Sequence, residues 1–81
     1  MNQTEVLERM QPVFDEVFSD PVVLRPTLSA HEVREWDSLA HVSLVLAIEQ
    51  AFGIRFRVGE VEMTRNVGEL ADLIVKRGSK G

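Results

Sequence analysis

The chain has 81 residues, no cysteine and a net charge of −4 at pH 7, with 44% hydrophobic and 27% charged residues. These values describe one ordinary folded domain and exclude disulfides, thiolate metal ligands and a cysteine nucleophile. The acidic balance argues against nucleic acid as a partner, and no apolar run is long enough for a membrane span or placed like a signal peptide, so we expect a cytoplasmic protein.

The first helix is predicted to follow Asn2, because Asn2 and Glu5 are spaced as a capping box. Pro12 predicts a bend inside this helix, since proline removes a backbone donor. The run at residues 19–21 is expected to end it. Five apolar residues recur at helical spacing and predict a single buried face: Val6, Met10, Val13, Phe14 and Val17.

Residues 19–36 form a long connection that we expect to be ordered, because structureless loops of this length are uncommon in compact domains. Ser29 and Glu32 have the spacing of a second capping box, which predicts a short helical turn. Three apolar residues of the connection are expected to pack inward: Val22, Val23 and Leu24.

The second long helix is predicted from Ser38 to Phe52, with Gly53 as its C-terminal cap. Residues 54–58 alternate like a strand, but no partner strand is evident in the sequence. We therefore expect an extended connector whose residues Ile54 and Phe56 face the core.

A short helix is expected around residues 59–63, followed by a last long helix that begins with a third capping box, Asn66 with Glu69. Lys76 and Arg77 suit the negative C-terminal end of that helix, and Gly78 is expected to stop it. Its apolar face is predicted to consist of four residues: Val67, Leu70, Leu73 and Ile74.

Together these elements predict an all-α fold, a small four-helix bundle with three longer helices, one short helix and a long ordered loop between the first two. We expect a single domain over residues 1–81, with a folded core at about 3–77 and a short basic tail at 78–81.

The most informative segment is the start of the second helix, where Asp37 and Ser38 follow a long loop. Free backbone N–H groups and the positive end of the helix dipole gather there, so a phosphate attached to this serine would be stabilised. The same Asp-Ser pair is also typical of an ordinary helix cap with no further role.

The second helix carries apolar residues on two opposite sides. One side is predicted to face the core: Ala40, Leu44, Val45, Ile48, Ala51 and Phe52. Leu39, Val42 and Leu46 lie nearly opposite, and a small bundle cannot easily bury both sides. This second stripe therefore indicates a docking surface, unless the long loop folds over it.

The run Trp36-Asp37-Ser38-Leu39, the segment at residues 48–54 and the final helix together resemble acyl carrier proteins over roughly residues 3–77. The resemblance implies a four-helix fold and a serine that receives phosphopantetheine from coenzyme A through a separate transferase. Ser38 then matches the modified serine, and Asp37 and Leu39 match its acidic and apolar neighbours.

The same resemblance implies that partner enzymes contact the second helix at Val42 and Leu46, beside Leu39 and Glu49. The expected partners are a phosphopantetheinyl transferase and the acyl-loading and acyl-transfer enzymes of a biosynthetic pathway, and the carrier is expected to be a monomer. Many members carry several carboxylates on this face, whereas this chain has only Glu49 between residues 38 and 52.

Several alternatives remain open at the level of sequence. The chain could carry aminoacyl or peptidyl groups, or it could be an unmodified interaction module of the same fold. Ser38 and His41 are three residues apart, but no oxyanion hole or nucleophile-elbow motif accompanies them, so we expect no enzyme activity. His31 and His41 lack metal-ligand spacing, so no metal site is expected, and His41 is interpreted as a half-buried helix residue.

Overall fold

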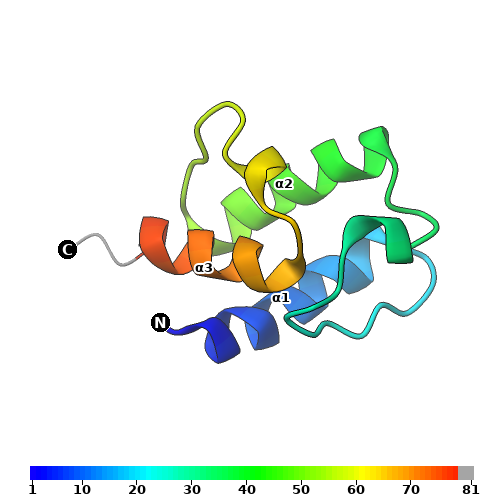
Figure 1. Ribbon diagram of the computed structural model, residues 1–81, viewed down its shortest axis with the longest axis horizontal. Coiled ribbons are helices and arrows are strands. Elements are labelled where there is room, and N and C mark those ends of the chain that lie inside the picture. Colours follow the sequence, from blue (N-terminus) through cyan, green and yellow to red (C-terminus); the bar gives the residue numbers. More distant parts are fainter. Residues whose placement is uncertain (79–81) are drawn as a thin grey trace.

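The computed structural model describes residues 1–78 and consists of three α-helices joined by ordered connections (Figure 1). The helices are α1 (Gln3–Val17), α2 (Ser38–Phe52) and α3 (Val67–Gly78), and two 3-10 turns, η1 (Ala30–Glu32) and η2 (Val61–Met63), interrupt the connections. The all-α class is confirmed, and residues 1–78 contain no strand. The expected fourth helix is not confirmed, because a single 3-10 turn stands in its place.

The end of the predicted basic tail, residues 79–81, lies outside the described residues. Within the described residues 1–78, α3 extends through Gly78, one residue beyond the expected end of the folded core at residue 77.

Helix α1 begins with the predicted capping box. The Asn2 side chain accepts a hydrogen bond from the Glu5 backbone N–H at 2.9 Å, and the Glu5 carboxylate accepts one from the Asn2 N–H at 3.0 Å. The helix continues through Pro12 to Val17, and Phe18 forms its C-cap. These two bonds satisfy the N–H groups of Asn2 and Glu5, and so help to fix where the helix begins.

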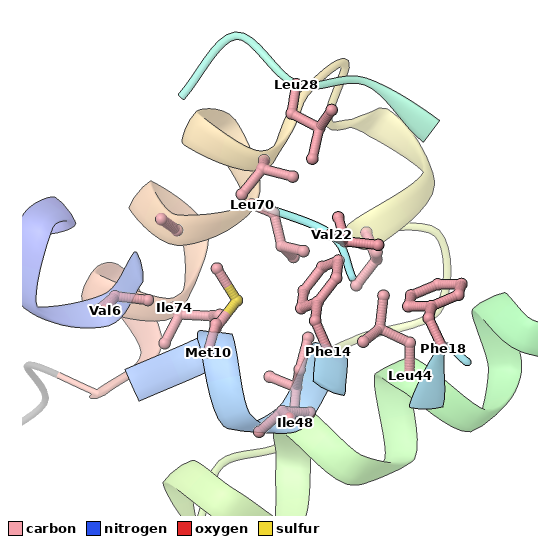
Figure 2. Close-up of a cluster of buried hydrophobic side chains, with 14 residues drawn as sticks. Val6, Met10, Phe14, Phe18, Val22, Leu28, Leu44, Ile48, Leu70 and Ile74 are labelled. Carbon is pink, nitrogen blue, oxygen red and sulfur yellow. The ribbon is translucent and has the colours of Figure 1, made fainter. Parts of the chain in front are cut away.

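Helix α1 makes the main contacts with both other helices, so the core lies around it. Figure 2 shows its buried side chains interleaved with those of α2, α3 and the long loop. The fully buried side chains include the largest apolar residues of the core: Phe14, Met10, Leu44, Ile48, Ile74, Val6 and Val67. Leu73, which was predicted on the apolar face of α3, is half-buried at the edge of this core.

The core-facing side of α2 is narrower than the sequence predicts. Leu44 and Ile48 are buried, and Ala40 and Val45 pack at the margin. Ala51 is exposed, so its assignment to the core was wrong.

Phe52 is half-buried, not fully enclosed, and the Arg9 guanidinium lies over its ring, 4.5 Å from the centroid. Phe52 thus packs against the core as expected, whereas Ala51 was misjudged because helical spacing alone cannot show where the neighbouring helix stops covering a face.

The long connection between α1 and α2 packs against the core, but through only some of the predicted residues. Val22 and Leu28 are buried and Leu24 is half-buried. Val23 was expected to pack inward and is 76% exposed. Successive side chains of an extended backbone point in opposite directions, so burial of Val22 turns Val23 outward.

The connection also caps α3. The Val67 N–H donates to the Leu28 carbonyl at 2.7 Å, and the Gly68 N–H donates to the Pro26 carbonyl at 2.9 Å. A Cβ atom on Gly68 would lie 2.8 Å from that Pro26 oxygen, so only glycine allows this approach. Two of the free N–H groups at the start of α3 are therefore satisfied by the loop.

Only one of the two hydrogen bonds of the capping box predicted for Asn66 and Glu69 is formed. The Asn66 side chain accepts from the Glu69 N–H at 2.8 Å, but the Glu69 carboxylate accepts from the Arg65 N–H at 2.9 Å, not from Asn66. At the other end of α3, Arg77 forms an ion pair with Glu60, which joins the helix to the connection before it.

Candidate functional site at the start of helix α2

Ser38 is the first residue of α2 and stands exposed where the long loop becomes a helix. Its hydroxyl has no hydrogen-bond partner among residues 1–78, so it is available for modification. The Ser29 hydroxyl, in contrast, donates to Glu32 at 3.1 Å. The position therefore offers a free hydroxyl on a rigid element, which a modifying enzyme can approach from solvent.

Asp37 is the N-cap of α2, and its carboxylate accepts a hydrogen bond from the Ala40 N–H at 2.9 Å. This bond sets the backbone direction at which Ser38 leaves the loop. Gly53 closes the other end of the helix with φ +64°, as predicted for its cap. The helix that carries the serine is therefore defined at both ends by its local sequence.

Glu35 holds the approach to Ser38 in place. Its carboxylate accepts hydrogen bonds from the backbone N–H groups of Asp20 at 2.9 Å and Ser19 at 3.0 Å. The N–H of Asp20, followed by that of Ser19, lowers the pKa of the Glu35 carboxyl because both bonds favour its charged form. The loop before the serine is thus tied to the end of α1, an interaction that sequence analysis missed.

Trp36 anchors the same segment in the core. Its ring makes an edge contact with Phe14 at a centroid distance of 5.5 Å and a tilted contact with Phe18 at 5.8 Å. Such aromatic pairs contribute about 0.5–1.5 kcal/mol each beyond simple burial. The two residues before Ser38 are therefore fixed, one by packing and one by capping.

His41 is half-buried one turn after Ser38, which confirms its expected environment. The Trp36 indole N–H donates to Nδ1 of His41 at 3.1 Å, and Nε2 of His41 lies 3.0 Å from a Glu62 carboxylate oxygen. Both ring nitrogens are therefore engaged away from Ser38. Ser38 and His41 therefore do not form the serine–histidine pair that hydrolases use.

The three residues Leu39, Val42 and Leu46 form what we call the outer stripe of α2. Their side chains are 80%, 57% and 54% exposed, so the long loop does not cover them. The structure thus confirms that this second apolar face is open. No carboxylate other than Glu49 lies on α2, so the stripe is apolar and almost uncharged.

Glu49, the fourth predicted contact residue, is half-buried, and its carboxylate accepts a hydrogen bond from the Phe56 N–H at 2.8 Å. This bond holds the connector against the end of α2, with Ile54 and Phe56 packed on the core as expected. Glu49 also lines a shallow hollow of about 210 Å³ together with Leu46. It lies at the margin of the outer stripe and has a structural role there.

A second hollow lies beside the serine, between the end of α1 and the start of α2. It is lined by residues of both helices and of the loop: Glu16, Val17, Glu35, Asp37, Leu39, Ala40 and Ser43.

No helix within residues 1–78 has the length and apolar character needed to cross a lipid bilayer. The same residues contain no group of three or more side chains suited to hold a metal ion.

Comparisons with known proteins agree with this geometry. A family model described as a phosphopantetheine attachment site matches residues 36–74, which begin two residues before Ser38. The acyl carrier protein of Thermosynechococcus vestitus is 35% identical over 75 residues, covering 91% of this chain and 93% of its own length. Acyl carrier protein 2 of Ralstonia nicotianae is 32% identical over 71 residues, covering 86% and 88%.

The fold is also that of a solved relative. The solution NMR structure of the holo acyl carrier protein from Geobacter metallireducens matches with a TM-score of 0.85 and 38% sequence identity, covering 93% of this chain and 87% of the other. The agreement extends over sequence, fold and the segment around the serine. The chain therefore belongs to the acyl carrier protein family, and it is an acyl carrier that bears phosphopantetheine.

Proposed function

We propose that Ser38 is the residue to which phosphopantetheine is attached, and that the chain presents an acyl group on this arm without catalysing any reaction itself. The observation that carries the proposal is the free, exposed hydroxyl of Ser38 on the first turn of α2. Asp37 supports it by capping the helix. The arm supplies a terminal thiol, which holds a carboxylic acid as a thioester.

The residues around Ser38 fit such a group. A phosphodiester on the first helical residue lies at the positive end of the helix dipole, and the Ser38 hydroxyl needs to break no internal bond to accept it. Asp37, which uses its carboxylate on Ala40, keeps the helix start intact whether or not the arm is present. The chain's contribution is therefore orientation and access, and the modifying chemistry belongs to a separate transferase.

The proposed partner surface is the outer stripe of α2, with Glu49 at its margin. Leu39 is adjacent to Ser38, and Val42 and Leu46 follow at one-turn intervals, so an enzyme that reaches the arm must lie close to these side chains. The proposed partners are a phosphopantetheinyl transferase and enzymes that load or receive the acyl group. We further propose that the protein is a monomer, since its buried apolar residues form one core, and that it is cytoplasmic.

The attachment site is tested by mass spectrometry of the intact protein. After incubation with coenzyme A and a broad-specificity phosphopantetheinyl transferase, the natural chain is expected to gain one arm and Ser38→Ala to gain none. Ser43→Ala is the matched control, because Ser43 is an exposed serine on the same helix beside the same hollow. A mass gain in Ser38→Ala, or its loss in Ser43→Ala, would contradict the assignment.

The melting temperature of Ser38→Ala is expected to stay within about 2 °C of the natural chain, because no hydrogen bond within residues 1–78 is removed. This control distinguishes a lost attachment site from a lost fold.

A further inference from the structure

The chain of contacts from Trp36 through His41 to Glu62 joins three separate parts of the molecule. Trp36 belongs to the loop before Ser38, His41 to α2, and Glu62 to η2. The indole and imidazole rings are also stacked, with centroids 6.3 Å apart and an interplanar angle of 23°. A single imidazole therefore connects the segment that leads to the attachment serine with the connection between α2 and α3.

The hydrogen-bond donors in this series of contacts define the protonation state of His41. An indole N–H can only donate, so Nδ1 of His41 must accept and carries no proton. Its Nε2 then carries the proton of a neutral imidazole and donates it to Glu62. The observed arrangement thus requires the neutral ring, and a second proton on Nδ1 would leave two donors facing each other.

We propose that His41 is a positioning residue for the modification of Ser38. Its imidazole holds Trp36 and the approach to the serine in place only while the ring is neutral. The functional part of this proposal, the effect on modification, depends on Ser38 being the attachment site. The structural part, the hold on Trp36, depends on the contacts alone. Acidification places a proton on Nδ1, breaks the Trp36 bond and leaves His41 paired with Glu62.

The charged groups around the ring are few. Glu62 from η2 faces it directly, and Arg65 lines the same cavity of about 220 Å³, where it is paired with Glu69 of α3. Asp37, one turn earlier on α2, directs its carboxylate to the Ala40 N–H. From α1, the uncharged rings of Phe14 and Phe18 contact Trp36. Glu62 therefore provides the counter-charge for a protonated His41.

The structural part is tested on the whole chain, whose only tryptophan is Trp36 and which has no tyrosine. Its indole fluorescence and indole N–H resonance are followed from pH 8 to pH 5, roughly the range in which imidazoles titrate. We expect one transition in the natural chain and in His31→Gln, whose imidazole is exposed on η1, and none in His41→Gln, which keeps a polar side chain that does not titrate. A transition that persists in His41→Gln, or is absent from the natural chain, overturns the proposal.

The functional part is tested by the rate of modification by a broad-specificity phosphopantetheinyl transferase. The rate of the natural chain divided by that of His41→Gln, both at the same pH, cancels the enzyme's own pH dependence. We expect this ratio to fall about fivefold between pH 8 and pH 5, because one hydrogen bond contributes ~1 kcal/mol. A ratio that stays constant with pH overturns the positioning role.

A third variant, His41→Phe, is expected to slow modification at every pH, because it removes both hydrogen bonds. If Ser38 proves not to be the attachment site, the spectroscopic transition is still expected, so the two proposals fail independently.

Discussion

Individual side chains in this molecule divide into those that fill the core and those that join loops to helices. Phe14 belongs to the first group and is fully buried between Phe18 and Trp36. Phe52 belongs to the margin, where the Arg9 guanidinium covers its ring. The two phenylalanines allow one substitution to be compared at two levels of enclosure.

We predict that Phe14→Ala lowers the free energy of unfolding by about 3–5 kcal/mol, the usual range for a buried phenylalanine. Phe52→Ala is expected to cost only about 2 kcal/mol, because less apolar area is lost and one cation–π contact disappears. Urea denaturation of both variants measures the difference. Equal losses would mean that Phe52 is as enclosed as the sequence periodicity suggests.

At the scale of the element, α2 has two apolar faces with opposite roles. Leu44 is 1% exposed and faces α1, whereas Val42, two residues earlier, is 57% exposed on the outer stripe. Both are aliphatic residues on the same helix. Their different exposure separates a contribution to folding from a contribution to partner binding.

We predict that Val42→Asp slows modification of Ser38 at least about tenfold, an effect of roughly 1.4 kcal/mol, with little change in melting temperature. Leu44→Asp is expected to unfold the domain, because a buried carboxylate has no partner there. Modification rates and thermal melts of both variants provide the measurement. Normal modification of a folded Val42→Asp protein would show that the stripe is exposed without being used.

The salt dependence of modification gives a second test of the same surface. Because α2 presents apolar groups and almost no charge, we expect the modification rate of the natural chain to change less than about threefold between 50 mM and 500 mM salt, roughly the range over which exposed charges become screened. A steep fall with salt would place the contact with the transferase on the charged surfaces of α1 or the loop.

Elements whose ends depend on local chemistry could be predicted from the sequence. Asn2 with Glu5, Asp37 and Gly53 each act within one turn, so the limits of α1 and α2 follow from neighbouring residues. Two contacts of side chains with distant backbone could not be predicted. Glu35 accepts from the Asp20 N–H, and Gln11 donates to the Val22 carbonyl at 2.6 Å. They join segments whose proximity exists only after the chain has folded.

The site shows the same division. Ser38 and the outer stripe follow from helical geometry and from the motif, whereas the bond from His41 to Glu62 spans 21 positions and has no periodic signal. The short helix expected at residues 59–63 is present only as the 3-10 turn Val61–Met63. Gly59, with φ +85°, lies outside helical backbone geometry.

Across the whole molecule, glutamate side chains tie the connections to their neighbours. Glu60 forms an ion pair with Arg77 and accepts a hydrogen bond from the Arg57 N–H at 2.7 Å. The Arg77 side chain, followed by the Arg57 N–H, lowers the pKa of the Glu60 carboxyl below its ordinary value of 4.5. The pKa values of the Glu32 and Glu69 carboxyls are lowered as well. The main causes are the Ser29 N–H and hydroxyl for Glu32 and the Arg65 N–H for Glu69.

Because these folded-state pKa values lie below the unfolded ones, the stabilisation is complete above about pH 4.5 and is lost as the pH falls through the lowered values. We predict that the melting temperature declines below that pH, and that Glu60→Gln reduces the decline. Glu8→Gln is the control, since Glu8 is exposed and has no hydrogen bond or ion pair within residues 1–78. An acid decline that is identical in all three proteins would contradict the role given to Glu60.

The bonds from the Val67 and Gly68 N–H groups to the Leu28 and Pro26 carbonyls have a consequence for the order of folding. A helix of the length of α3 nucleates poorly by itself, and here its first turn is completed by backbone some 40 positions earlier in the chain. We therefore expect the long connection and α3 to form as one cooperative unit, although they are distant in sequence. The amide protons of Val67 and Gly68, which make these two bonds, should exchange with solvent only when the connection and α3 separate.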